Sequence, residues 1–206
     1  MAKDLPPGAS MTRKLFLLSP ASTSGRRAQL LFNERAQFSL AQALHSGAGA
    51  SLGEVFSFLS GLYFRGKLAY ARTFAETAAD IRVITPDRGL LHPDTIVTLD
   101  DLRAFSTSPI DVSNEKYTEP LMRDALALSS ADPAIILGSI ASNKYTDILL
   151  HIYDDRLLFP QEFIGRGDMS RGGLMLRCVD NNEELTYVPV SGAIRHGKRP
   201  PKLNPR

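Results

Sequence analysis

Short apolar runs that stop at turn-forming residues predict the strands of this 206-residue chain. A buried strand is typically a run of four to eight apolar residues bounded by glycine, proline or serine. Residues 14–18 end at Ser-Pro, residues 134–137 end at Gly-Ser, and residues 80–85 alternate polar and apolar before a proline. Residues 54–59 alternate in part and end at Ser-Gly, so we expect a strand there as well.

Apolar residues spaced three or four apart predict the helices. This spacing occurs in residues 38–44 and 117–129, and residues 145–151 have a helical pattern too. Residues 67–79 are rich in alanine and other good helix formers.

Two further strands are expected near the C-terminus, in residues 174–179 and 185–190. The polar residues 180–183 between them are typical of a hairpin turn. Strands that alternate with helices imply a single α/β domain over residues 14–193. We expect a mostly parallel or mixed central sheet, helices on its faces and a C-terminal β-hairpin.

Charge is unevenly distributed along the chain. Of its 24 lysines and arginines, eight lie in residues 1–14 and 195–206, which leaves 16 basic against 21 acidic residues in 15–194. The body is therefore mildly acidic, which does not favour a broad nucleic-acid surface. We expect residues 1–13 to be a flexible tail, and the basic, proline-rich residues 194–206 to be a disordered one.

Composition excludes several classes. No stretch approaches the roughly 20 apolar residues of a membrane span, so we expect no membrane partner. Residues 1–14 lack the apolar run of a secretory signal. Cys178 is the only cysteine, which rules out an intrachain disulfide and fits a cytoplasmic protein. The four histidines are scattered without ligand spacing, so no metal and no other cofactor is expected.

The densest chemical signal lies in residues 165–173, with two arginines, an aspartate, a serine and four glycines. Glycine lets the backbone approach a ligand closely, and arginine offers a planar fork of donors for phosphate or carboxylate. We interpret this segment as an anion-binding loop.

Four other polar loops follow or precede the expected strands and helices: residues 19–27, 60–67, 85–93 and 138–145. Ligands of open α/β sheets collect outside the carboxyl ends of the strands. We therefore expect these loops to converge with residues 165–173 on a phosphate-bearing ligand. The ligand-binding candidates are Ser19, Ser22, Thr23, Arg26, Arg88, Ser142, Tyr145, Arg166, Ser170 and Arg171.

Asp87 and Asp168 are the candidate catalytic residues, because a partly buried carboxylate can act as a general base. Simpler explanations remain open. Residues 85–94 contain the residues that turns require, Ser142 suits a helix N-cap, and Tyr145 suits packing against a sheet. The arginines of residues 165–173 can pair with neighbouring acids.

Five short segments occur in the same order as motifs of a known family. Residues 19–23 resemble Ser-Pro-Ala-Lys-Thr, and residues 89–93 resemble part of Tyr-Gly-x-Leu-Arg-Pro. Residues 141–145 are similar to Ala-Ser-x-Glu-Tyr, and residues 166–171 to Arg-Gly-x-Met-(Ser/Ala)-Arg. Gly61 and Gly66 match the glycine spacing of Gly-Asp-x-Tyr-x-Gly.

Together these segments resemble the YaaA family of bacterial peroxide-stress proteins. The chain departs from the family where Ser22 replaces a lysine, Leu62 an aspartate, Phe64 a tyrosine and Lys144 a glutamate. The resemblance implies a compact α/β fold, DNA binding and a role under oxidative stress.

Three functions follow as hypotheses. In the first, a nucleic acid is bound without turnover by Arg26, Arg27, Arg166, Arg171 and the basic tail, with Tyr145 stacking on a base. In the second, an enzyme cleaves or transfers the N-glycosidic bond of a nucleotide or nucleoside, and Asp87 or Asp168 activates water. In the third, the chain is a non-catalytic interaction protein. The oligomeric state stays open.

Overall fold

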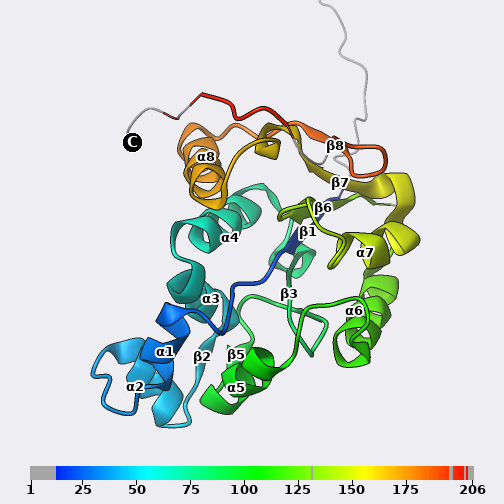
Figure 1. Cartoon of the computed structure of the whole chain (residues 1–206). Coiled ribbons are helices and arrows are strands. Elements are labelled where there is room, and N and C mark those ends of the chain that lie inside the picture. Colours follow the sequence, from blue (N-terminus) through cyan, green and yellow to red (C-terminus); the bar gives the residue numbers. More distant parts are fainter. Residues whose placement is uncertain (1–12, 131, 195–196, 202, 204–206) are drawn as a thin grey trace, which may run out of the picture.

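A six-stranded mixed sheet forms the centre of the molecule, with the strand order β4-β3-β1-β6-β7-β8 (Figure 1). The computed structural model describes residues 13–130, 132–194, 197–201 and 203. The parallel strands are β3 (Ile81–Ile84), β1 (Leu15–Leu18), β6 (Ala134–Leu137) and β7 (Leu157–Pro160). Antiparallel strands flank them: β4 (Leu90–Leu91) beside β3, and β8 (Tyr187–Pro189) beside β7. A small second sheet pairs β2 (Ala50–Ser51) with β5 (Ile96–Val97).

Helices cover both faces of the central sheet (Figure 1). One face carries α1 (Arg26–Phe32), α2 (Ser39–His45), α3 (Leu52–Ser60), α4 (Leu62–Phe74), α5 (Leu99–Thr107) and α8 (Asp168–Asn181). The other carries α6 (Glu115–Leu128) and α7 (Thr146–Tyr153). Short 3₁₀ turns lie at Ala78–Asp80, Asp154–Arg156 and Gln161–Phe163.

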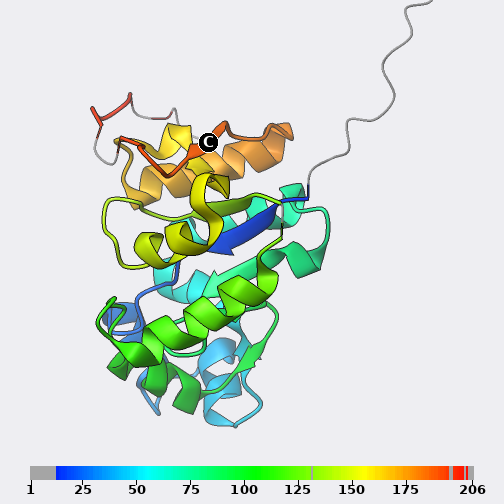
Figure 2. The ribbon, with the colours of Figure 1, turned by 90° about the vertical axis from the view of Figure 1, so that its right-hand side faces the viewer.

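Alternation along β1 divides the core into two clusters. Phe16 and Leu18 pack with α1–α5 and α8, whereas Leu15 and Leu17 pack with α6 and α7. This follows from the two-residue period of a strand. In Figure 2 the blue β1 arrow lies in the middle of the molecule, with the orange α8 above it. All four β1 side chains are buried, so the strand is fixed on both faces.

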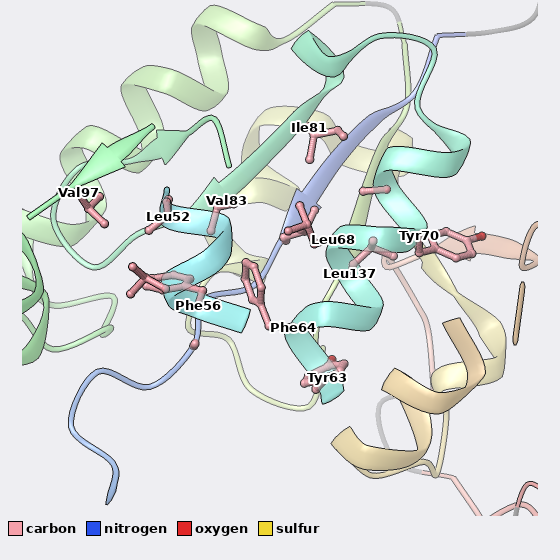
Figure 3. Close-up of a cluster of buried hydrophobic side chains, with 14 of the residues drawn as sticks. Leu52, Phe56, Tyr63, Phe64, Leu68, Tyr70, Ile81, Val83, Val97 and Leu137 are labelled. Carbon is pink, nitrogen blue, oxygen red and sulfur yellow. The ribbon is translucent and has the colours of Figure 1, made fainter. Parts of the chain in front are cut away.

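Aromatic rings pack against one another within the larger cluster, part of which Figure 3 shows from close by. The Phe56 and Phe64 rings meet edge to face with centroids 5.4 Å apart, and Phe105 meets Phe56 at 6.3 Å. Such pairs contribute about 0.5–1.5 kcal/mol each beyond the area that they bury. They fix α3 and α5 against the N-terminal half of α4.

The α/β fold class expected from the sequence is confirmed, as are the strands at 14–18, 80–85 and 134–137. The helices expected at 38–44, 117–129 and 145–151 are also present within a few residues. The helix expected at 67–79 begins earlier, at Leu62, and ends at Phe74. Residues 62–67 of the expected 60–67 loop are therefore helical.

Two expected strands are wrong. Residues 54–59 belong to α3, which begins because the Ser51 side chain accepts a hydrogen bond from the Glu54 backbone N–H at 3.2 Å. Residues 174–179 belong to α8, where Gly172, Met175 and Cys178 recur every three residues on the buried face. The chain does have a C-terminal antiparallel strand pair, but β8 pairs with β7 and not with residues 174–179.

The expected tails fall mostly outside the described residues. Within 1–13 only Arg13 is described, and its Nε donates to Asp80 at 2.5 Å. Within 194–206 the described residues are 194, 197–201 and 203. In the described part of the chain, no helix combines the length and the apolar character that crossing a bilayer requires.

Candidate functional site

After the parallel strands β1 and β6, the chain continues to opposite faces of the sheet. β1 leads to α1 on one face of the sheet, and the neighbouring parallel strand β6 leads to α7 on the other. The strand ends stay together, because the Ser19 backbone N–H donates to the Leu137 carbonyl at 3.2 Å. A crevice opens at such a switch point in α/β sheets, and ligands bind there.

A pocket of about 410 Å³ lies at this crevice. Hydroxyl-bearing residues from two segments form much of its wall, and Lys144 and Tyr145 close one side. The lining residues are Ser19, Pro20, Ala21, Ser22, Thr23, Ser24, Pro86, Phe105, Ser106, Thr107, Ser108, Pro109, Ile110, Lys144 and Tyr145. We call this hollow the crevice pocket.

A fully buried lysine lies next to the crevice pocket, bonded to one of its walls. Lys67 of α4 donates from Nζ to the Ser19 carbonyl at 2.5 Å and to Ser19 Oγ at 2.9 Å. The same ammonium faces two aromatic rings of its own helix, Tyr63 at 4.4 Å and Phe64 at 4.9 Å from the centroids. Cation–π attraction and two hydrogen bonds thus replace part of the water that the ammonium has lost.

Burial lowers the pKa of Lys67 to about 7, because the charged form is poorly solvated. Asp168 on α8 raises this pKa and Arg171 on the same helix lowers it, so the two partly cancel. The charged and neutral forms of Lys67 are therefore both populated near neutral pH, whereas an exposed lysine stays charged there.

Two tyrosines lie beside this lysine. Tyr145 donates its hydroxyl to the Ser139 carbonyl at 2.5 Å, and burial raises its pKa to about 12, partly offset by a hydrogen bond with Ser19. The Tyr63 hydroxyl is buried near the Arg171 guanidinium, which lowers its pKa, but the larger effect of burial raises it. Both phenols keep their protons at neutral pH and remain donors.

A glycine keeps the floor of the crevice open. A Cβ at Gly138 would lie 2.8 Å from the Tyr145 hydroxyl, 2.8 Å from Ser19 Cβ and 3.0 Å from Ser19 Oγ. Real Cβ atoms do not come this close to other heavy atoms, so only glycine lets these two side chains meet above β6.

A second pair of glycines brings α8 against α4. A Cβ at Gly66 would lie 2.7 Å from the Gly172 carbonyl oxygen, and one at Gly172 would lie 2.6 Å from the Leu62 carbonyl oxygen. The two backbones are thus in contact. This crossing puts the first turn of α8, with Asp168 and Arg171, within electrostatic reach of Lys67.

Four of the residues expected from the sequence line the crevice pocket together: Ser19, Ser22, Thr23 and Tyr145. Asp87 lies in an adjoining hollow of about 390 Å³, which shares Thr107, Ser108 and Pro109 with the pocket. Its Oδ1 is buried without a hydrogen-bond partner among the described residues, and desolvation raises its pKa despite the nearby Arg88.

The remaining candidates of the N-terminal and middle loops lie outside the crevice-pocket wall. Arg26 is the exposed first residue of α1. Arg88 pairs with Asp101 and lies over the Phe105 ring. Ser142 is exposed, and its carbonyl accepts a hydrogen bond from Thr146.

Residues 165–173 do not form the expected loop, because α8 begins at Asp168. Arg166 and Ser170 line a separate pocket of about 440 Å³ with Arg199, Pro200, Pro201 and Leu203. Arg166 donates to the Glu162 carbonyl at 3.0 Å and to Ser170 at 3.2 Å. The expected convergence of this segment on the crevice pocket is therefore wrong for Arg166 and Ser170.

Arg171 and Asp168 hold parts of the protein to each other. The Arg171 guanidinium donates twice to the Phe163 carbonyl at 3.2 Å, and its side chain is only 13% exposed. Asp168 lies 3.7 Å from this guanidinium with its side chain 68% exposed. Neither residue lines the crevice pocket.

Lys67 and Tyr63 were not among the candidates from the sequence. A signal existed: Lys67 follows Tyr63 by four residues and Phe64 by three, so a helix that starts at Leu62 puts all three on one face. A lysine on the apolar face of a helix is rare enough to mark a position.

The chain matches none of the protein-family models, the curated proteins or the solved structures with which it was compared.

Proposed function

We propose that this protein binds a small phosphate-bearing ligand of nucleotide size in the crevice pocket. One observation carries the proposal: a pocket of about 410 Å³, rich in serine and threonine residues and closed by Lys144, at the diverging ends of β1 and β6. Small-molecule sites commonly occupy about 300–1,000 Å³ and occur at such switch points. Hydroxyls and a lysine are suitable donors for a phosphate group.

The arginines favour a small ligand over a nucleic acid. Arg27 donates to the Phe58 carbonyl at 2.9 Å, Arg166 to the Glu162 carbonyl and Arg171 to the Phe163 carbonyl. Donors that hold backbone carbonyls are less available for phosphates, and residues 15–194 have a net negative charge. Nucleic-acid binding is therefore an outcome of the test below and not our first proposal.

Thermal shift with a defined panel tests the proposal: inorganic phosphate, 5′-AMP, 5′-GMP, 5′-UMP, 5′-CMP, single-stranded RNA and duplex DNA. We expect at least one mononucleotide to stabilise the protein, by about 2.7 kcal/mol at 100 times its Kd. Stabilisation by duplex DNA that collapses with salt, without any shift by mononucleotides, would establish the nucleic-acid function instead.

Two variants locate the binding. Lys144→Gln removes a pocket charge from an exposed side chain and should weaken the mononucleotide without lowering the melting temperature of the free protein. Arg166→Gln, in the other pocket, should leave the mononucleotide affinity unchanged. The reverse pattern would place the ligand at α8 and end the proposal for the crevice pocket.

A nucleotide- or nucleoside-cleaving enzyme is the second candidate, because of Asp87. A buried carboxylate oxygen without a partner and a raised pKa are features of general acids and bases. Asp87 ranks second because it lies in the adjoining hollow. Release of free base from the same mononucleotides, lost in Asp87→Asn, would support it; no release from any of them would exclude it for this panel.

We also propose the relation to the YaaA family, with its stress role. The proposal is supported by two of the quoted motifs, residues 19–23 and 141–145, which contribute residues to one pocket. A cytoplasmic location is proposed on the same footing, since the free Cys178 is buried and the fold relies on no disulfide among the described residues.

A further inference from the structure

A serine hydroxyl at the wall of a pocket is hydrogen-bonded to a lysine that forms no ion pair with any carboxylate of the described residues. Ser19 Oγ lies 2.9 Å from Lys67 Nζ, and Ser19 belongs to the lining of the crevice pocket. Among the described residues Lys67 forms no salt bridge, and it has no exposed surface. Among the charged side chains of the described residues, Asp168, which is largely exposed, raises the pKa of Lys67 and Arg171 lowers it.

We propose that Ser19 is a nucleophile activated by Lys67 as its general base, and that the pair cleaves a small carboxylic ester held in the crevice pocket. A hydroxyl is a weak nucleophile until an adjacent base removes its proton, and serine–lysine pairs can do this. The inference uses the same pocket as the proposed function, but it does not depend on the ligand carrying a phosphate.

The reaction balances with water as the only co-reactant. Neutral Lys67 Nζ takes the Ser19 Oγ proton while Oγ bonds to the ester carbonyl carbon. The carbon–oxygen bond to the alcohol then breaks, and the alcohol leaves with the proton from Lys67. Water attacks the resulting acyl-serine, gives a proton to Lys67, and the carboxylic acid leaves as Oγ regains its proton.

Tyr145 lies beside this pair, but its single hydroxyl proton is donated to the Ser139 carbonyl at 2.5 Å, so this donor is already engaged. Its hydroxyl lines the same pocket, lies over Gly138 beside Ser19, and stays protonated because its pKa is about 12.

The lysine has to be neutral to act, and its surroundings favour this. The groups that face it are the Tyr63 and Phe64 rings on α4, Asp168 and Arg171 on α8, and Ser19 after β1. With a pKa of about 7, roughly half of Lys67 is neutral at pH 7. The competing explanation is structural: Lys67 holds the Ser19 carbonyl at the end of β1 and nothing more.

A fluorophosphonate probe distinguishes the two explanations, since it reacts with an activated serine by forming an Oγ–P bond as the P–F bond breaks. We expect mass spectrometry to find the adduct on Ser19, none on Ser19→Ala, and wild-type labelling on the control Ser46→Ala, whose serine lies in α2's exposed C-cap. Labelling of other serines only, or no labelling, would overturn the inference.

Lys67→Met keeps an unbranched apolar side chain one atom shorter than that of lysine and removes the base. Its labelling rate constant and its turnover of p-nitrophenyl acetate should fall at least about a hundredfold, the usual contribution of a general base. The control Lys198→Met alters an exposed lysine outside the crevice-pocket lining and should match the wild type. A folded Lys67→Met that reacts at the wild-type rate would leave Lys67 with its structural role alone.

The pH profile of the wild type keeps the test independent of variants that fail to fold. The labelling rate should rise with pH and level off above a midpoint near 7, where Lys67 loses its proton. A rate that keeps rising through pH 9 indicates uncatalysed hydroxyl chemistry and refutes the base.

The same experiments separate this inference from the proposed function. A nucleotide that shifts the melting temperature while Ser19 stays unlabelled would leave the binding function and remove the nucleophile. Labelled Ser19 without any nucleotide shift would do the opposite. If both hold, a bound mononucleotide should slow the labelling of Ser19.

Discussion

The crevice pocket and the first turn of α8 handle positive charge in opposite ways. At α8, Arg171 donates two hydrogen bonds to the Phe163 carbonyl, and Arg166 donates to the Glu162 carbonyl and to Ser170. At the crevice, Lys67 is completely buried and meets two oxygen atoms of Ser19 and two aromatic rings, with no salt bridge in the described part of the chain. The arginines act as cross-links between segments, whereas the lysine is held where its charge is unfavourable.

The difference shows why the density of charged residues is a poor guide to a site. Residues 165–173 hold the most concentrated chemistry in the sequence, yet their strongest contacts are internal. A residue whose surroundings oppose its charge is the better indicator, because such strain persists in a fold mainly where function uses it.

The largest expected effect concerns Lys67 and pH. The lysine pKa is about 10.5 when unfolded and about 7 when folded, so between these values the unfolded chain binds a proton that the folded protein has released. The stability of the wild type relative to Lys67→Met should therefore rise by about 2 kcal/mol from pH 7 to pH 9, and change little below pH 6. Urea unfolding of both proteins at each pH measures this.

The comparison between the two proteins cancels the other titrating groups that both share, including the nearby Tyr63 and Tyr145. A difference that is flat from pH 6 to pH 9 would mean that Lys67 keeps its proton, and the contrast with the arginines would disappear.

The contact between α4 and α8 connects the surroundings of Lys67 with the first turn of α8, and Gly172→Ala would disrupt it. The new Cβ would meet the Leu62 carbonyl oxygen at 2.6 Å and Tyr63 Cα at 2.9 Å, and backbone cannot move aside cheaply. We expect the free energy of unfolding to fall by about 1–3 kcal/mol.

Gly173→Ala is the matched control, because Leu203, at 3.7 Å, is the one contact its Cβ would make among the described residues. This variant should keep or gain stability, by up to about 1 kcal/mol, since alanine favours a helix over glycine. Equal losses in the two variants would show that helix propensity and not the α4–α8 crossing governs this segment.

A smaller effect separates the two arginines of the α8 region. Arg171→Met should lower stability by about 1 kcal/mol, because the buried Phe163 carbonyl loses two guanidinium donors but keeps the Arg166 backbone N–H at 3.1 Å. Arg166→Met should cost less, since the Glu162 carbonyl and Ser170 that it leaves lie nearer to solvent. A larger loss in Arg166→Met would reverse this ranking.

The sequence was sufficient for the central strands, because β1, β3 and β6 are short apolar segments bounded by turn residues. It misled at residues 174–179, where a run of mixed apolar residues after glycines fits a strand as well as a helix. The helix forms there because Gly172 allows α8 to touch α4, a contact between residues about a hundred positions apart. No local pattern contains that information.

Part of the candidate site could also be predicted from the sequence. Four lining residues come soon after recognisable strands: Ser19, Ser22, Thr23 and Tyr145. Because ligands of α/β sheets bind at the carboxyl ends of the strands, the sequence predicted that these residues share a site. Recognising Lys67 required knowing where α4 begins. A helix expected to start at residue 67 does not include Tyr63 and Phe64, whose rings face the lysine. The structural role of Arg166 follows from its hydrogen bonds to the Glu162 carbonyl and Ser170, which the sequence pattern does not reveal.

Amide chemical shifts in the presence of 5′-AMP, or of the mononucleotide that stabilises the protein best, compare the two regions most directly. The account predicts that the largest changes occur in residues 19–25 and 138–146 around the crevice pocket, with smaller changes in residues 165–173. The largest changes in residues 165–173 or 197–203, with the crevice unaffected, would contradict it.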